Sequence, residues 1–199
     1  MSYVKSRKSY EEQEMSDEDT LRFKIVLAGD GAVGKTSLRK KYMGEGFEVD
    51  YKQTIGADYA LCETKLENSA FKFQIWDLAG QPIFKDVVKP YYEGSTGAIM
   101  VYDVTRAESL DNLKHWINDL FNYGGLMPVV IVGNKIDLKR VVPPEAGKTF
   151  VADMSNNYGI TFHYFETSAV TGVNVKETFE ALGKDILEKI EKVRAKITE

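Results

Sequence analysis

Short apolar runs alternate with segments of helical periodicity along the chain from Leu21 onward. The apolar runs are rich in β-branched and aromatic residues, which favours strands, and the segments between them space their apolar residues as on one face of a helix. This alternation is typical of an α/β domain in which helices cover a mostly parallel sheet. The predicted strands are Arg22–Ala28, Tyr59–Leu66, Phe71–Trp76, Ala98–Val104, Val129–Val132 and Thr161–Glu166.

The helical segments have recognisable ends. Gly44 and the pair Gly124-Gly125 are placed to terminate two of the helices, and Pro143-Pro144 suits the first turn of a third, where a proline loses no hydrogen bond. The predicted helices are Thr36–Met43, Leu110–Leu120, Pro143–Asn156 and Val175–Val193. Glu67-Asn68-Ser69 is the short connection of a predicted hairpin, so one strand should run antiparallel to the rest.

Length and charge favour one domain with a charged extension. The chain has 199 residues, enough for one domain with a substantial core. Residues 1–20 are polar and densely charged, so we expect a mobile N-terminal extension before a domain at 21–199. Lys and Arg number 26 against 30 Asp and Glu, and no long basic run occurs. Nucleic acid is therefore not an expected partner.

The sequence predicts a cytoplasmic monomer without a lipid anchor. No apolar run approaches the roughly 20 residues that span a bilayer, and the N-terminus lacks the apolar region of a signal peptide. Position 2 is Ser, which excludes N-myristoylation, and the C-terminal residues contain no cysteine for prenylation. The single cysteine, Cys62, cannot form an intramolecular disulfide, in agreement with a reducing compartment.

A phosphate-binding loop follows the first predicted strand. The run from Gly29 to Thr36 matches G-x-x-x-x-G-K-[ST], in which backbone N–H groups converge on an anion at the N-terminus of a helix. Lys35 adds a charge for the β- and γ-phosphates, and Thr36 offers its hydroxyl to Mg²⁺. The predicted phosphate contacts are Gly29, Asp30, Gly31, Ala32, Val33, Gly34, Lys35, Thr36 and Ser37.

A second motif, Asn134-Lys135-Ile136-Asp137, follows the fifth predicted strand and indicates guanine. The Asp137 carboxylate can accept hydrogen bonds from the N1–H and 2-amino groups of guanine, whereas adenine cannot supply that pair. We expect Asp137 to be a buried carboxylate that ATP would leave unpaired, so that ATP is strongly rejected. Asn134 is expected to brace the base edge and the neighbouring loop, and the stem of Lys135 to cover the ring face.

A third motif, Glu166-Thr167-Ser168-Ala169, follows the last predicted strand. Its Ala169 N–H should face guanine O6, and Ser168 and Val170 complete the predicted base contacts. All three motifs lie at the carboxyl ends of strands, where doubly wound sheets bind nucleotides. A phosphate loop alone would leave an ATPase or a nucleotide kinase open, but the second motif argues against both.

The predicted groups for hydrolysis lie in two further loops. Asp77 ends an apolar strand and can reach Mg²⁺ through water, and Thr54 provides a second hydroxyl ligand. Gly80 can bring its N–H to the γ-phosphate. Gln81 carries both a donor and an acceptor, as a residue that orients the attacking water requires, so Gln81 and Lys35 are the predicted catalytic residues.

From about Leu21 to Ile190 the chain resembles small GTPases of the Ras superfamily. The runs Tyr51–Tyr59 and Trp76–Gln81 are similar to the Rab branch in particular. The resemblance implies a three-layer P-loop NTPase fold with a six-stranded sheet and about five helices, GTP and GDP as ligands and Mg²⁺ as cofactor. It also implies effectors, an exchange factor and a GTPase-activating protein as partners. By the same resemblance Phe47 packs on the guanine, Tyr51 closes over the phosphates, and the effector surface comprises Tyr59, Trp76 and Tyr91.

Three positions depart from the Rab pattern, and they leave an alternative open. Leu78 replaces a usual threonine, Pro82 a usual glutamate and Val170 a usual lysine. The segment between Gly44 and Thr54 contains no arginine, so we expect slow intrinsic hydrolysis that a partner's arginine accelerates. The main interpretation is a GTP-hydrolysing molecular switch, and the alternative is a GTP-binding interaction module with little or no hydrolysis.

Overall fold

The computed structural model describes residues 21–45, 54–66 and 69–198. The predicted N-terminal extension, residues 1–20, and the predicted ligand contacts Phe47 and Tyr51 lie outside the described residues. The helices and strands are β1 (Leu21–Ala28), α1 (Lys35–Tyr42), β2 (Ala57–Leu66), β3 (Ser69–Leu78), α2 (Lys85–Val88), β4 (Gly97–Asp103), α3 (Ala107–Asp111), α4 (Leu113–Gly124), β5 (Val129–Asn134), α5 (Pro144–Tyr158), β6 (Phe162–Thr167) and α6 (Val175–Thr198).

The six strands form one sheet in the order β2-β3-β1-β4-β5-β6. β2 pairs with β3 antiparallel, with Leu66 opposite Ser69, and the other neighbours are parallel. The predicted hairpin and the mostly parallel sheet are confirmed. β1 lies between β3 and β4, so the order of the strands reverses at β1. In such folds ligands usually bind outside the carboxyl ends of the strands at this point.

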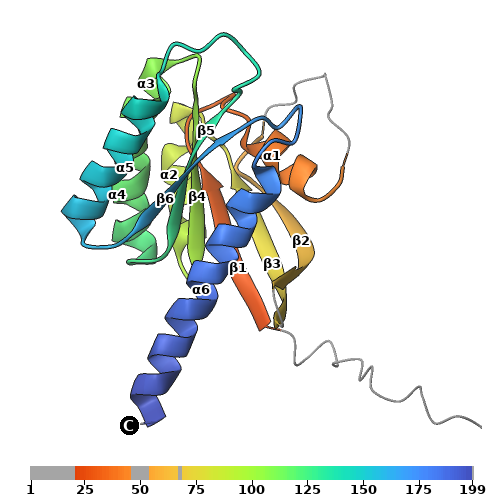
Figure 1. The fold of residues 1–199 in the computed structure, drawn as a ribbon, viewed down its shortest axis with the longest axis vertical. Helices are drawn as coiled ribbons and strands as arrows, with labels where there is room; N and C mark the ends of the chain where they lie inside the picture. The colour runs from red at the N-terminus through yellow and green to blue at the C-terminus, as the bar shows by residue number, and fades with distance from the viewer. Residues whose placement is uncertain (1–20, 46–53, 67–68, 199) are drawn as a thin grey trace, which may run out of the picture.

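Helices cover both faces of the sheet (Figure 1). Ile25 and Leu27 of β1 pack with residues of α1 and α6, while Val26 and Ala28 pack with residues of α4 and α5. Successive strand residues point to opposite faces, so a continuous apolar run supplies both cores. β4 and β5 are buried along their whole length, which explains why their sequences lack polar alternation.

The predicted elements are present, with shifted boundaries. The second predicted helix, Leu110–Leu120, lies in a region that is divided at Asn112 into α3 and α4, and α6 continues to Thr198. β5 ends at Asn134 rather than Val132, so Asn134 belongs to the strand. The short turns at Pro82–Phe84, Lys85–Val88 and Lys89–Tyr92 were not predicted, because each is too short to show a helical period. No helix among the described residues meets the length and hydropathy of a membrane span.

Candidate functional site

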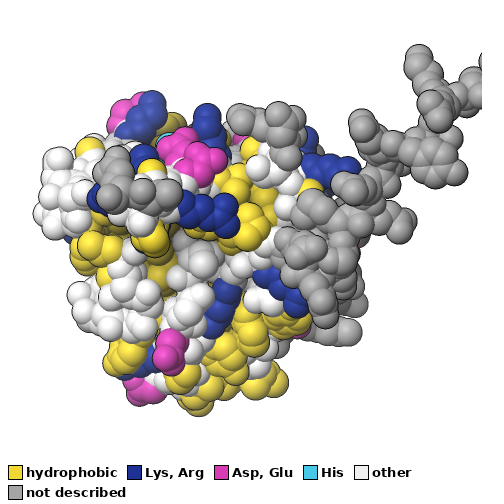
Figure 2. Space-filling view, turned by 90° about the horizontal axis from the view of Figure 1, so that it is seen from below, with side chains coloured by type: hydrophobic (Ala, Val, Ile, Leu, Met, Phe, Trp, Pro, Cys, Tyr) yellow, Lys and Arg dark blue, Asp and Glu magenta, His cyan; other side chains and the backbone are white. Residues whose placement is uncertain are grey.

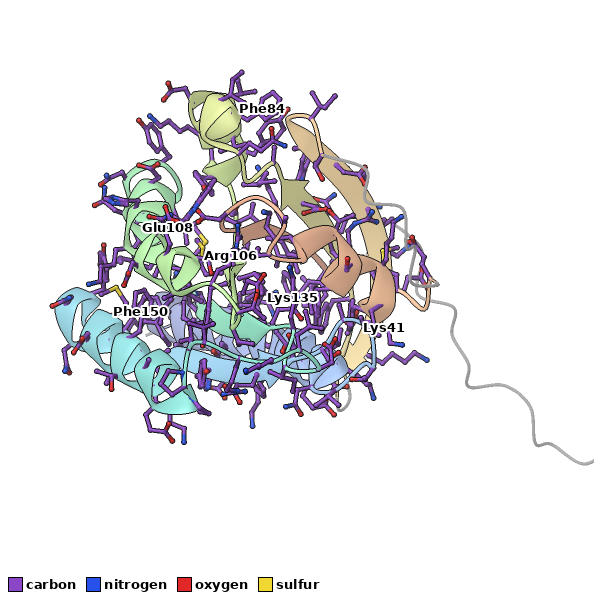
Figure 3. All side chains as sticks on the ribbon, turned by 90° about the horizontal axis from the view of Figure 1, so that it is seen from above. Lys41, Phe84, Arg106, Glu108, Lys135 and Phe150 are labelled. Atoms are coloured by element: carbon purple, nitrogen blue, oxygen red, sulfur yellow. The ribbon has the colours of Figure 1, made fainter. Side chains whose placement is uncertain are left out.

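The three motif loops meet at one edge of the sheet. Pairing aligns Asp103 of β4 with Asn134 of β5, and Asn134 with Thr167 of β6. The loop after β1 lies beside them, because β1 pairs with β4. Figure 3 looks onto this edge and labels Arg106 and Lys135, which come from the loops after β4 and β5. Residues that are far apart in the sequence therefore form one site.

Lys35 of the phosphate loop is hydrogen-bonded to the backbone of its own loop. Gly34, with φ of +100°, leads into α1, and a Cβ at this position would collide with the Asn134 side chain. Lys35 is buried, and its Nζ donates to the carbonyl oxygens of Gly29 and Asp30, both at 2.8 Å. In a nucleotide complex, a phosphate would compete with these two carbonyls for the N–H donors of the Lys35 ammonium.

Burial lowers the pKa of Lys35 from its ordinary value to about 8. Arg106 lowers the pKa further, while the carboxylates of Asp77 and Asp30 oppose the shift. A phosphate at the loop would favour the charged form of the lysine and so raise its pKa again. Binding of an anion above about pH 8 is therefore coupled to proton uptake at Lys35.

Thr36, Thr54 and Asp77, the three predicted metal-site residues, lie together. The Thr36 hydroxyl donates to Asp77 Oδ2 at 2.5 Å, and the Thr36 and Thr54 hydroxyl oxygens lie 3.2 Å apart. Asp77 is fully buried, and its Oδ1 has no hydrogen-bond partner among the described residues. Burial raises the pKa of Asp77, although the Thr36 hydrogen bond and the charge of Lys35 oppose the rise. A buried carboxylate oxygen without a donor is a free ligand position.

Asn134 joins all three motif loops. Its Nδ2 donates to the Val33 carbonyl at 2.9 Å, and its Oδ1 accepts from the Thr167 hydroxyl at 3.0 Å and from the Ala169 N–H at 3.3 Å. Asn134 is buried, so its polar atoms need these hydrogen bonds, and the bonds hold the three loops in position. The bracing of the neighbouring loop agrees with the sequence analysis, while contacts with a base stay predictions for both Asn134 and Ala169.

Asp137 is oriented by Ser168 rather than by burial. The Ser168 hydroxyl donates to Asp137 Oδ1 at 2.6 Å and accepts from the Thr171 N–H at 3.0 Å. Asp137 itself is exposed, so the expectation of a buried carboxylate was wrong. The reason is that Asp137 lies beyond the end of β5, in the loop before Arg140, where none of the described side chains buries it. Val170 is also exposed.

Asp30 belongs to the phosphate loop, but its carboxylate is bound by Trp116 of α4 and by Asn112, the residue before α4. Asn112 Nδ2 donates to Asp30 Oδ2 at 2.8 Å, and Trp116 Nε1 donates to Asp30 Oδ1 at 2.9 Å. Trp116 is also buried in the core, as the helical spacing of the apolar residues in this segment indicates. Sequence reasoning missed its second role, because an indole on an apolar helix face gives no signal that its N–H reaches a loop.

The segment with Gly80 and Gln81 passes close to the phosphate loop. A Cβ on Gly80 would collide with the carbonyl oxygens of Gly29 and Asp30, so only glycine fits there. A Cβ on Gly31 would lie 3.5 Å from Gln81 Cγ. Leu78 is fully buried at the end of β3, so a core role explains its apolar side chain.

An aromatic row lies on the antiparallel side of the sheet. Ring centroids of Tyr59 and Trp76 are 5.1 Å apart, and those of Trp76 and Tyr91 are 5.2 Å apart. Tyr59 is half-exposed, and Lys24 Nζ lies 5.5 Å from the Trp76 ring centroid.

The opposite end of the molecule from the motif loops carries hydrophobic side chains interspersed with both basic and acidic ones (Figure 2).

Comparisons with known proteins agree with this geometry. The model of the Ras family matches residues 24–188. Ras-related protein Rab7 of Pisum sativum is 38% identical over 173 residues, which cover 82% of each chain. Ras-related protein Rab-8B of Homo sapiens is 39% identical over 171 residues, which cover 84% of this chain and 80% of the relative. The chain therefore belongs to the Ras family and is a Rab-like small GTPase, a molecular switch that hydrolyses GTP.

Proposed function

We propose that the three motif loops hold GTP or GDP with Mg²⁺, and that hydrolysis uses the residues brought together at the sheet edge. The single observation that carries this proposal is the cluster of Thr36, Thr54 and Asp77 beside the phosphate loop. Two hydroxyls and a carboxylate are hard oxygen ligands of the kind Mg²⁺ prefers, and Mg²⁺ in such sites keeps several waters. The unpaired Oδ1 of Asp77 fits a water-mediated contact with the ion.

The residues divide the work of hydrolysis among them. When bound, Mg²⁺ neutralises charge on the β- and γ-phosphates. Lys35 adds a second positive charge to the same oxygens, and its buried position gives that charge greater weight than it would have in water. Gln81, next to Gly31, orients the attacking water through its amide donor and acceptor. Gly80, which has no side chain to block it, brings its N–H toward the γ-phosphate.

The two nucleotide states would differ in the loops that carry Thr54 and Gln81. Thr54 contacts the cluster through its hydroxyl, which lies 3.2 Å from that of Thr36, and short turns follow Gln81. Loss of the γ-phosphate would remove contacts from both segments and release them. The aromatic row lies close to both segments in the chain: Tyr59 follows Thr54, Trp76 precedes Gln81, and Tyr91 follows the short turns after Gln81. Effectors that bind this row would therefore distinguish the two states.

Removal of Mg²⁺ tests the metal site. We expect EDTA to accelerate release of a fluorescent GDP analogue by about tenfold or more, because the nucleotide loses the charge that links its phosphates to the hydroxyls. In Asp77→Asn, release should already be fast and should respond weakly to EDTA. Asp153→Asn, on the exposed face of α5, is the matched control. Equal EDTA responses in Asp77→Asn and the control would contradict the role of Asp77.

Partners and cellular location follow from the same proposal. We propose a cytoplasmic monomer that acts through protein effectors, an exchange factor and a GTPase-activating protein. The exposed aromatic Tyr59 and its neighbours support a protein-binding surface. A pull-down that compares the GTP-analogue and GDP forms would identify effectors by their preference for the former.

A further inference from the structure

Two consecutive carbonyl groups of the phosphate loop are bound from outside by cations. Arg106 Nη2 donates to the Gly31 oxygen at 2.8 Å, and Lys135 Nζ donates to the Ala32 oxygen at 2.7 Å. Arg106 follows β4 and Lys135 follows β5, and both lie at the edge of the sheet seen in Figure 3. The sequence motifs include Lys135, but no motif includes Arg106.

One buried carboxylate holds both cations in place. Asp103, at the end of β4, is 2% exposed, and its Oδ2 lies 2.6 Å from Lys135 Nζ and 3.8 Å from Arg106 Nε. Although burial opposes ionisation, hydrogen bonds from Lys135 and Thr105 keep the pKa of Asp103 below its ordinary value. Asp103 is therefore charged at neutral pH and draws the two cations to one side of the phosphate loop.

The two carbonyl contacts fix which way the loop amides point. In a trans peptide unit the C=O and the following N–H point in opposite directions. A Gly31 carbonyl held toward Arg106 directs the Ala32 N–H away from Arg106, to the inner side of the loop. Ala32 has φ of +61°, a left-handed backbone conformation that a non-glycine residue adopts only where its surroundings impose it. Arg106 supplies part of that constraint.

We propose that Arg106 is a positioning residue of the phosphate loop, which it holds so that the Ala32 N–H faces the phosphates. This inference rests on the proposed function, in which the loop binds GTP or GDP. Inward N–H groups form the anion-binding concavity of such loops. Arg106 acts through the backbone, so its effect should reach both nucleotide retention and, through Gly31 and the adjacent Gln81, hydrolysis.

The test compares wild-type protein with Arg106→Ala and Arg106→Lys, each loaded with GDP and Mg²⁺. We expect Arg106→Ala to release a fluorescent GDP analogue about tenfold faster, because the Gly31 carbonyl loses a charge-assisted hydrogen bond. Arg106→Lys should recover part of the loss, since an ammonium can donate to the same carbonyl but lacks the second contact with Asp103. Arg194→Ala, on an exposed position of α6, is the charge-matched control and should release the analogue at the wild-type rate.

The Ala32 amide proton distinguishes positioning from a simple loss of charge. In ¹⁵N-alanine-labelled wild-type protein this proton should resonate downfield, because its N–H donates to a phosphate oxygen, and in Arg106→Ala it should move upfield. An unchanged Ala32 resonance would overturn the proposal, whether or not release is faster. A wild-type protein that binds no GDP would instead contradict the proposed function, so the two failures are distinguishable.

Discussion

The substitution Asp137→Asn is expected to lower the affinity for GDP by about 10³-fold or more and to create binding of xanthosine diphosphate. The carboxylate accepts hydrogen bonds from guanine N1–H and the 2-amino group, and an asparagine places an N–H where one of these donors lies. Xanthine has a carbonyl at position 2, which can accept that N–H. Ser168 keeps its donor in the variant, so the side chain should stay near its present position.

Competition binding measures this change directly. GDP, xanthosine diphosphate and ADP compete with a fluorescent GDP analogue for wild-type protein, and with a fluorescent xanthosine analogue for the variant. Asp153→Asn removes the same charge from the exposed face of α5 and should leave the preference for GDP unchanged. Normal GDP affinity in Asp137→Asn would remove the carboxylate from base recognition.

The second large effect is expected at Gln81. Gln81→Leu should slow single-turnover hydrolysis of bound GTP by about tenfold or more, because leucine of similar volume can neither donate to nor accept from the attacking water. GTP affinity should stay close to that of wild-type protein, since the loops that hold the base and phosphates are unchanged.

Pre-loaded protein provides the measurement. GTP labelled at the γ-phosphate is bound, excess nucleotide is removed, and phosphate release is followed over time. Gln74→Leu, in β3 away from the site, is the matched control and should hydrolyse GTP at the wild-type rate. An unchanged rate in Gln81→Leu would show that another group orients the water.

The motif loops could be predicted from the sequence because each follows an apolar strand. Parallel pairing then places the ends of β4, β5 and β6 side by side, as the alignment of Asp103, Asn134 and Thr167 confirms. The mostly parallel sheet could be predicted from the same apolar strands, because strands buried on both faces, such as β4 and β5, need a continuous apolar sequence. Thr36 and Asp77 were predicted to share a site, and they are in direct contact.

The residues that brace these loops could not be predicted in the same way. Trp116 and Asn112 lie on or beside a helix whose apolar period is explained by core packing, so their contacts with Asp30 leave no pattern in the sequence. Arg106 lies outside every motif, and its bond to Gly31 depends on how two loops meet in space. Asp103 did carry a signal, because it ends an apolar strand as Asp77 does.

The nucleotide that accompanies freshly purified protein tests the central claim most directly. The protein is denatured, and the released nucleotide is separated by chromatography and quantified against protein concentration. A switch that hydrolyses GTP slowly and releases its product slowly should carry mainly GDP, close to one nucleotide per chain. Mainly GTP would contradict hydrolysis and favour a permanently loaded binding module, and an adenine nucleotide would contradict the assigned base specificity.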